Sequence, residues 1–244
     1  MSKQNPGQHS ASGLLVVGKD VQRTDAVSKV TGSAQYVADL HLPGMLHAAV
    51  LRSPHPNARI VAIDVSAAAA LPGVKTVVTG ADTAGRKWGA FRPDLYPLAI
   101  DRVRYVGDEV AAVAATDPET ARAAVDRIVV QYEVLPAVLS LDAALAPGAP
   151  LVHDDTPGNV AHHFNFERGD VDAGFKASDV IVEGTLESIR QWHTSLETIG
   201  CVAQWTSGRV TMWCNTQTPF LARGRYATAL GVPEGQVRVI QTEV

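Results

Sequence analysis

Polar side chains interrupt the apolar stretches at two places in the second half of the chain. The first is the run Arg190-Gln191-Trp192-His193, which is followed closely by Glu197. A solvent-exposed loop between two strands ordinarily carries small turn residues such as Gly, Asn or Ser. The larger hydrogen-bonding side chains found between two expected strands here therefore indicate a candidate site. The simpler interpretation, which we favour, is that His193 and Glu197 bond to each other or to backbone and close a loop of the core.

These side chains do not form a metal-ligand pattern. His193 and Glu197 would need a third ligand from elsewhere in the chain, and the adjacent pair His162-His163 would point to opposite faces of a strand. The spacing fits none of the usual metal-binding motifs. The sequence therefore disfavours a metal ion held directly by these residues.

The second candidate is the run Asn215-Thr216-Gln217-Thr218, which lies between an expected strand ending at Cys214 and a helix beginning near Pro219. In α/β proteins, ligands bind where strands end and helices begin. Gln217 could orient a bound group through its amide, and the amides of the helix start could hold an anion. Alternatively, Thr216 or Thr218 caps the helix and Gln217 only fills the turn. The residues alone leave both interpretations open.

Other common sources of chemistry are missing from the sequence. It contains no nucleophile elbow, P-loop, kinase loop or dinucleotide fingerprint. The two cysteines, Cys201 and Cys214, lie in apolar stretches without a CxxC pattern, so we expect no disulfide framework, zinc ribbon or iron–sulfur cluster within this chain. Gly107-Asp108-Glu109 is expected to be a tight turn with solvated acids.

The elements of the first half follow from apolar periodicity and turn chemistry. Two strands are expected at 46–51 and 59–65, paired with each other across the turn Ser53-Pro54-His55-Pro56-Asn57. Ser66 is expected to cap a short alanine-rich helix, and a strand follows at 74–79. Further predictions are a strand–loop–strand over 103–115, a helix from Asp117 to about Arg127, and a strand at 128–132.

In the second half, a helix is expected at 171–177 and a long alternating strand at 179–188. A hairpin follows, with strands at 201–205 and 209–214 joined by the three-residue turn Thr206-Ser207-Gly208. A helix then ends at Gly231, before a strand at 236–242. The predicted domains are a flexible tail at 1–18, a first unit at 19–140, a Pro- and Gly-containing arm at 141–159 and a second unit at 160–244.

Composition and charge narrow the class of protein. The chain has 244 residues, a formal net charge of −4 and 6% aromatic residues. Without a basic face or stacking platforms, nucleic acid is not an expected partner. No apolar run approaches the roughly 20 residues that span a bilayer, and the polar N-terminus does not resemble a secretory signal peptide. We therefore expect a cytoplasmic protein that does not bind a membrane.

The order of motifs along residues 18–244 resembles the molybdenum-binding subunit of the xanthine dehydrogenase and aldehyde oxidase family. The most recognisable stretch is Val103-Arg104-Tyr105-Val106-Gly107-Asp108-Glu109-Val110-Ala111. Other stretches similar to the family are, in chain order, Arg23-Thr24-Asp25, Lys29-Val30-Thr31-Gly32, Tyr36-Val37-Ala38-Asp39, Leu51-Arg52-Ser53-Pro54-His55-Pro56-Asn57-Ala58-Arg59-Ile60, the helix expected from Ala121 to Val125, Val130-Gln131-Tyr132-Glu133-Val134-Leu135-Pro136, Gly169-Asp170-Val171 to Ala177-Ser178-Asp179, and Gln191-Trp192-His193 with Leu196-Glu197.

The resemblance implies an α+β fold: an α/β hammerhead domain followed by the beginning of a mixed α/β molybdopterin-binding domain. It also implies a molybdenum hydroxylase that oxidises an aldehyde or an N-heterocyclic or aromatic substrate, with water as the oxygen source. The implied cofactor is molybdenum–molybdopterin, in the cytosine dinucleotide form, and electrons would leave through 2Fe–2S clusters and FAD on partner subunits. In the family, a glutamine in a Thr-Gln-Thr or Thr-Gln-Asn context lies beside the apical oxo group of the molybdenum, and Gln217 matches it.

The chain also departs from the family pattern. The family's glycine-rich cofactor loop, substrate-orienting arginine and catalytic glutamate belong to later sequence, so no catalytic residue is assigned here. The implied partners are the remainder of the molybdenum subunit, an iron–sulfur small subunit, an FAD-binding medium subunit and a small-molecule substrate. We expect the isolated chain to be inactive. The alternative is a non-catalytic interaction or scaffold subunit built on the hammerhead fold.

Overall fold

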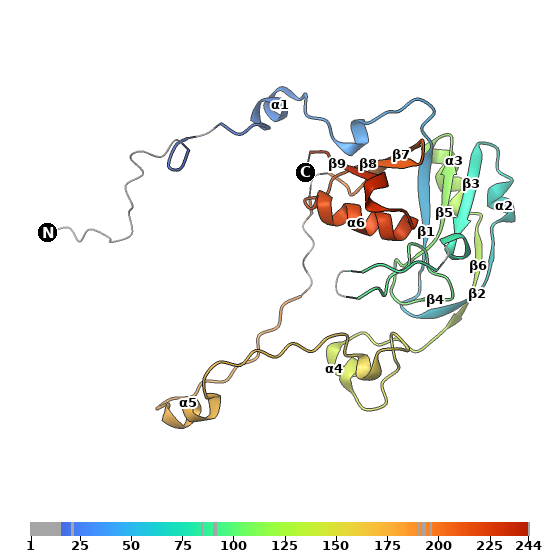
Figure 1. Ribbon diagram of the computed structural model, residues 1–244. Coiled ribbons are helices and arrows are strands. Elements are labelled where there is room, and N and C mark those ends of the chain that lie inside the picture. Colours follow the sequence, from blue (N-terminus) through green and yellow to red (C-terminus); the bar gives the residue numbers. More distant parts are fainter. Residues whose placement is uncertain are drawn as a thin grey trace.

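The computed structural model describes residues 16–20, 22–83, 85–89, 92–189, 191, 194–195 and 197–243. The strands of these residues form three sheets of three strands each (Figure 1). Most of the predicted tail lies outside the described residues. Helix α1 (Ala26–Thr31) and four 3-10 helices, Val37–Asp39, Gly80–Thr83, Pro157–Asn159 and Glu234–Gln236, lie outside the sheets, as do the helices described below.

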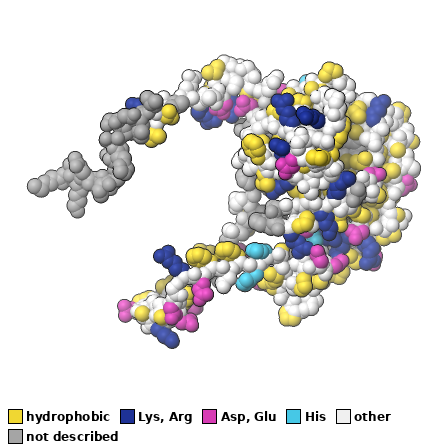
Figure 2. All heavy atoms as spheres, in the orientation of Figure 1, with side chains coloured by type: hydrophobic (Ala, Val, Ile, Leu, Met, Phe, Trp, Pro, Cys, Tyr) yellow, Lys and Arg dark blue, Asp and Glu magenta, His cyan; other side chains and the backbone are white. Residues whose placement is uncertain are grey.

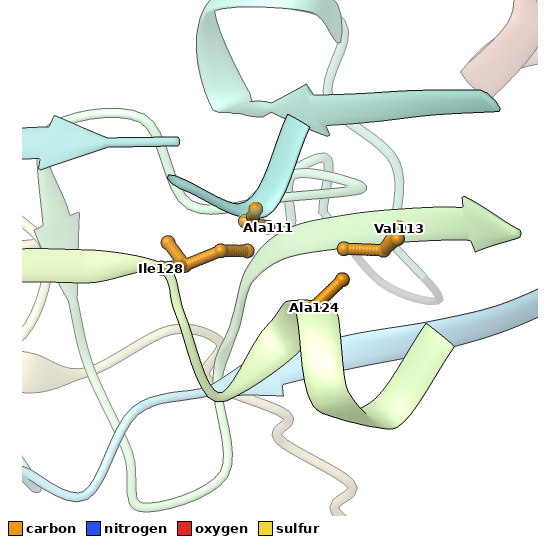
Figure 3. Packing of buried hydrophobic residues seen from close by; sticks show 5 residues of the cluster. Ala111, Val113, Ala124 and Ile128 are labelled. Atoms are coloured by element: carbon orange, nitrogen blue, oxygen red, sulfur yellow. The ribbon is translucent and has the colours of Figure 1, made fainter. Parts of the chain in front are cut away.

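The first sheet is antiparallel, with β5 (Glu109–Ala115) between β1 (His47–Arg52) and β3 (Val74–Thr79). Helix α3 (Pro118–Val125) packs on it and brings Ala124 to Ala111 and Val113 of the central strand (Figure 3). Alanines on both elements allow this close approach, and Ile128 completes the cluster. Asp117 caps α3 by accepting a hydrogen bond from the Thr120 amide at 2.7 Å.

The second sheet has the order β4 (Arg102–Val103), β2 (Ala58–Asp64) and β6 (Val129–Val134), with antiparallel pairs. The buried residues Ala58, Val103 and Val110 join it to the first sheet. Helix α2 (Ser66–Ala69) follows β2. The predicted cap by Ser66 is not observed: Val65 occupies the N-cap position, Ser66 is the first helical residue, and the Ser66 amide donates to the Asp64 carboxylate at 2.9 Å.

The predicted pairing of the first two strands is wrong. β1 pairs with β5, and β2 pairs with β4 and β6. The loop between β1 and β2 does not fold back on itself, because its polar groups bind other segments. Ser53 exchanges backbone hydrogen bonds with Gly107 and Asp108, and Asn57 donates to the Pro136 carbonyl at 2.5 Å. The loop therefore carries the chain from one sheet to the other.

The acids of Gly107-Asp108-Glu109 are not simply solvated, contrary to expectation. Asp108 accepts a hydrogen bond from the Arg104 amide at 2.9 Å, and its partial burial raises the pKa of the carboxyl above the usual range. Glu109 forms an ion pair with Arg52 at 2.7 Å and accepts from the Tyr105 hydroxyl at 3.1 Å. Gly107 has a φ of 97°, which explains the glycine at this turn.

Replacing Asp108 with asparagine is expected to stabilise the protein at neutral pH. Because the folded-state pKa of Asp108 is raised, the folded state binds the proton more tightly than the unfolded state, and stability is lost as pH rises through the folded pKa. Asparagine keeps an acceptor for the Arg104 amide without the charge. The gain in melting temperature of Asp108→Asn should therefore increase between pH 4.5 and 7.5. A gain that stays constant, or equals that of Asp126→Asn, an exposed site just after α3, would contradict the prediction.

Residues 141–159 are attached to the first unit. They contain α4 (Leu141–Leu145) and the 3-10 helix Pro157–Asn159. The Leu151 and Val152 carbonyls accept hydrogen bonds from Arg102 and Arg104 at 2.9 and 3.1 Å. Asn159 accepts from the Val152 amide at 2.9 Å and donates to the Ala144 carbonyl at 3.0 Å, which folds the segment on itself. The division at 140 and 159 stays a prediction.

The strand predicted at 179–188 is not formed. Residues 160–189 lead away from the sheets and contain one short helix, α5 (Val171–Ala177), which is the helix expected there (Figure 1). Val180, Val182 and Leu186 are 76%, 88% and 100% exposed, and Figure 2 shows hydrophobic side chains along this segment. A strand needs a hydrogen-bonding neighbour, and no other described segment pairs with this one.

The third sheet has β8 (Arg209–Cys214) at its centre, antiparallel to β7 (Cys201–Thr206) and parallel to β9 (Val237–Gln241). Helix α6 (Pro219–Leu230) connects β8 to β9 and covers the sheet, with Ala227 packed on Val210, Met212 and Val237. Gly231 ends α6 with a φ of 67°. No helix among the described residues is long and apolar enough to cross a membrane.

The hairpin turn between β7 and β8 is shorter than expected. Thr206 belongs to β7 and pairs with Arg209, so only Ser207 and Gly208 form the turn. Their φ values of 50° and 76° fit the two-residue type I′ turn that matches the twist of the strands. The register of the hairpin therefore differs by one residue from that of a three-residue turn.

Candidate functional site

Gln217 lies in the short loop between β8 and α6, where the sequence placed it. The residue is exposed, and its amide makes no hydrogen bond to any other described residue. Thr216 instead orders the backbone, since its hydroxyl accepts a hydrogen bond from the Thr218 amide at 3.2 Å. The Gln217 side chain is therefore available to a bound group.

The start of α6 has no side-chain cap. Thr218 occupies the N-cap position, but its hydroxyl makes no capping hydrogen bond, and Pro219 fills the first helical position. The first intrahelical bond runs from the Ala222 amide to the Thr218 carbonyl at 2.9 Å. The amides of Phe220 and Leu221 thus lie at a helix start where partial positive charge favours an anion. Capping by a threonine, one of the two interpretations left open, is not observed.

Asn215 fixes the loop that carries Gln217. Its side-chain oxygen accepts a hydrogen bond from the Gly200 amide at 3.2 Å, and its side-chain nitrogen donates to the Thr198 carbonyl at 3.0 Å. Both partners precede β7, so one amide side chain joins the approach to β7 with the exit from β8. Asn215 is therefore a positioning residue for the loop that presents Gln217.

Glu197, which follows the run Arg190-Gln191-Trp192-His193, contacts the backbone of the first half of the chain. Its Oε1 accepts a hydrogen bond from the Val37 amide at 2.8 Å, and its Oε2 is buried without a described partner. Glu197 thus bonds to backbone, as the simpler interpretation predicts. Arg190, Trp192, His193 and Leu196 lie outside the described residues.

His162 and His163 lie on the exposed segment 160–189. Among the described residues, no group of three or more His, Cys, Asp or Glu side chains comes together closely enough to hold a metal ion. The exposed side-chain amide of Gln217 offers hydrogen-bond donors and an acceptor.

Several contacts attach the third sheet to the first half of the chain. Lys29 of α1 forms an ion pair with Glu243 at 3.2 Å, beyond the end of β9. The Arg225 guanidinium of α6 lies over the Trp88 ring, 5.9 Å from its centroid. Together with the hydrogen bond from Val37 to Glu197, these contacts connect the third sheet and the residues next to it to residues 29, 37 and 88.

The two cysteines lie opposite each other at the end of the hairpin next to Asn215. Cys201 of β7 pairs in register with Cys214 of β8. Burial, with a smaller contribution from Cys214, raises the pKa of the Cys201 thiol. Burial and a hydrogen bond with Cys214 raise the pKa of Tyr226 on α6. The sequence analysis missed this pair; the signal that reveals it is the two-residue turn, which makes positions 201 and 214 symmetric about Ser207-Gly208.

A cavity of about 130 Å³ lies away from Gln217, where residues 152–153 meet the first unit. Its lining includes Tyr96, Arg104, Asp108 and His153. Burial, followed by the charge of Arg104, lowers the pKa of His153. Since Arg104 also binds the Val152 carbonyl, this cavity belongs to the attachment of residues 141–159 rather than to the Gln217 loop.

Two family models match the chain. Residues 31–136 match the a/b hammerhead domain of aldehyde oxidase and xanthine dehydrogenase, and residues 152–244 match the molybdopterin cofactor-binding domain. The residues matched by the first model include β1 to β6, and those matched by the second include the third sheet and Gln217.

Curated relatives and solved structures agree with these models. The chain is 43% identical to a probable xanthine dehydrogenase subunit of Bacillus subtilis over 222 residues, covering 90% of this chain and 30% of that protein. It is 38% identical to the nicotinate dehydrogenase large molybdopterin subunit of Eubacterium barkeri, covering 93% and 53%. The structure of quinoline 2-oxidoreductase from Pseudomonas putida 86 superposes with a TM-score of 0.82 at 38% identity, covering 93% and 30%. The chain thus spans between about a third and a half of these proteins.

Proposed function

We propose that this chain, which belongs to the xanthine dehydrogenase and aldehyde oxidase family of molybdenum hydroxylases, supplies the hammerhead domain and one side of the molybdopterin site to a hydroxylating dehydrogenase. The family and the α+β fold class predicted from the sequence are confirmed. The enzyme class, an oxidoreductase that uses molybdopterin, follows from the same relatives. The reaction of the complete protein is part of the proposal.

The proposed substrate class is an N-heterocycle or an aldehyde, hydroxylated at carbon with oxygen from water. Two observations support it: relatives of this chain are named for nicotinate and quinoline, and a neighbouring structure is an aldehyde oxidoreductase from Desulfovibrio gigas with a TM-score of 0.80. The proposed electron path runs through 2Fe–2S clusters on a small subunit and FAD on a medium subunit. We place the complex in the cytoplasm.

The observation that carries the proposal is the exposed Gln217 amide beside an uncapped helix start. Its donor chemistry fits a metal oxo group, which is a hydrogen-bond acceptor. When bound, molybdenum–molybdopterin, proposed in the cytosine dinucleotide form, supplies two-electron oxidation. Gln217 would donate a hydrogen bond from its side-chain nitrogen, and the amides of Phe220 and Leu221 would favour negative charge nearby.

The loop is suited to this task because it is fixed from behind. Asn215 binds both the Gly200 amide and the Thr198 carbonyl, so the backbone that carries Gln217 is held while its side chain is free. A donor held in this way needs little reorganisation when the cofactor binds. In this proposal, the glycine-rich cofactor loop, the substrate-orienting arginine and the catalytic glutamate come from polypeptide outside these 244 residues.

The exposed segment 160–189 supports completion by further polypeptide. Phe164, Phe166 and Leu186 are 79%, 77% and 100% exposed. Apolar side chains in such a run are unusual on a free surface and indicate an interaction site. We propose that the remainder of the molybdenum subunit covers this segment.

Gln217→Ala is expected to slow catalysis in the complete enzyme without changing its fold. Loss of one hydrogen bond to a metal centre typically costs about 10- to 100-fold in activity. The melting temperature should hardly change, because the exposed amide makes no described contact. The measurements are molybdenum content, melting temperature and the anaerobic rate of reduction by substrate, all on one preparation.

Gln204→Ala is the matched control, since Gln204 is an exposed glutamine on β7 of the same sheet. It should reduce at the wild-type rate. If Gln217→Ala keeps its molybdenum and is also reduced at the wild-type rate, Gln217 is a turn residue and the assignment to the cofactor site is wrong.

A further inference from the structure

The hairpin geometry brings Cys201 and Cys214 to bonding distance. In an antiparallel pair, residues directly opposite each other have Cα atoms about 4.5–5.5 Å apart. A disulfide needs a Cα separation of about 4.4–6.8 Å. Because Cys201 and Cys214 are paired in register, their backbones satisfy this requirement without moving.

The position of Cys201 and Cys214 along the β7–β8 ladder also favours a disulfide between them. Thr206 and Arg209 close the two-residue turn as a hydrogen-bonded pair, and hydrogen-bonded and non-hydrogen-bonded pairs alternate from there. Cys201 and Cys214 lie five steps from that pair along the ladder, so they are a non-hydrogen-bonded pair. Side chains of such pairs are the closer of the two kinds, and both point to the same face of the sheet.

The two thiols differ in their access to solvent. Cys201 is exposed, whereas Cys214 is buried, with 4% of its surface accessible. An oxidant from solution therefore meets Cys201 first, while Cys214 is placed to react with it. Redox-sensitive cysteines often share one feature with this pair, an accessible thiol next to a second thiol that can resolve its oxidised form.

We propose that Cys201 and Cys214 form a redox-active dithiol that is oxidised by hydroperoxides to a cross-strand disulfide and reduced again by thiols. In the first step, the Cys201 thiolate attacks a peroxide oxygen, the O–O bond breaks, and a sulfenic acid and water form. In the second step, the Cys214 thiolate attacks the Cys201 sulfur, the S–S bond forms, and the sulfenic oxygen leaves as water. Two thiols and one H₂O₂ thus give one disulfide and two waters.

The surroundings of the pair set its pH dependence. Within the described part of the chain, the titratable group that acts together with these two thiols is the hydroxyl of Tyr226 on α6, whose pKa is raised by burial and by Cys214. Since the pKa of Cys201 is raised, little thiolate is present at neutral pH, and oxidation should be slow there. The thiolate fraction, and with it the rate, should increase about tenfold between pH 7 and 8.

The test uses the full 244-residue chain treated with H₂O₂, alkylated and digested with trypsin under non-reducing conditions. Trypsin cleaves after Arg190, Arg209 and Arg223, so peptides 191–209 and 210–223 each carry one cysteine and stay together only through a disulfide. We expect the linked pair of peptides as the main product, in protein that migrates as a monomer. Dithiothreitol should restore both free thiols.

The matched control moves one cysteine by one residue. The double variant Cys201→Ser with Val202→Cys keeps two thiols, but residue 202 is opposite Trp213 and points to the other face of the sheet. Its yield of linked peptide should be at least about tenfold lower. The proposal is overturned if wild-type thiols are still alkylated after peroxide, if they oxidise only to sulfinic acid or to dimers, or if the shifted variant gives an equal yield.

Discussion

Gly80→Ala is expected to unfold the first unit under conditions in which the wild type is stable. Gly80 is buried directly after β3, and a Cβ atom there would lie 2.2 Å from the Ala99 carbonyl oxygen and 2.8 Å from the Ile100 Cα. Backbone atoms cannot rotate away as a side chain can. The Ala99 amide is also hydrogen-bonded to the Glu109 carbonyl at 2.6 Å, so movement would pull on β5.

The expected loss in the free energy of unfolding is about 3 kcal/mol or more, in the upper range of single substitutions. Urea unfolding followed by far-UV circular dichroism measures it. Gly235→Ala is the control, because a Cβ at Gly235 would meet nothing within 4 Å. The control should change stability by less than about 1 kcal/mol. Equal stabilities for Gly80→Ala and the wild type would show that β3 and Ala99 are not packed as described.

Arg102→Met is expected to release residues 141–159 from the first unit. The Arg102 side chain is only 15% exposed and donates to Asn57 Oδ1 at 2.8 Å, the Leu151 carbonyl at 2.9 Å and Asp154 Oδ1 at 3.3 Å. Asn57 is itself buried. Methionine preserves much of the apolar contact but leaves these acceptors unpaired. The expected loss is about 1–3 kcal/mol, the usual cost of leaving a buried polar group such as Asn57 unsatisfied.

Limited proteolysis provides a second measurement on Arg102→Met. Subtilisin suits it, since residues 141–159 contain no Lys or Arg for trypsin. Cleavage in this segment should become much faster than in the wild type. Arg59→Met is the matched control: its ion pair with Glu133 is exposed on both sides and should contribute less than about 1 kcal/mol. Unchanged cleavage in Arg102→Met would show that Arg102 does not hold the segment.

Local signals in the sequence predicted individual elements well. The helix at 171–177 and the strand at 74–79 have the predicted bounds, and α6 ends before Gly231 as expected. Each is determined by residues close in sequence, such as an N-cap, a run of branched residues or a C-terminal glycine.

Predictions that depended on distant partners failed. The strands at 46–51 and 59–65 were expected to form a hairpin because the residues between them favour a turn, but Ser53 and Asn57 bind residues 107–108 and 136 instead. The alternating run at 179–188 has the pattern of a strand but no partner among the described residues. Pairing is a property of two segments, and periodicity in one of them does not identify the other.

At the candidate site, the family resemblance singled out Gln217, but the groups that position it were not foreseen. The role of Asn215 depends on the backbone of residues 198 and 200, which only the paired strands bring near. The pairing of the two cysteines was not foreseen because the predicted turn was one residue too long. With the predicted three-residue turn, Cys201 would face Trp213, whereas the observed two-residue turn places it opposite Cys214.

The order of strands also determines when each sheet can form during synthesis on the ribosome. β1 at residues 47–52 has no neighbour until residues 109–115 emerge, and β2 must wait for β4 and β6. The β7–β8 ladder, in contrast, closes over two residues, and such hairpins form in about 1–10 µs. The nascent chain therefore holds the strands of its first unit unpaired through much of translation, whereas Cys201 and Cys214 meet almost as soon as the ribosome releases them.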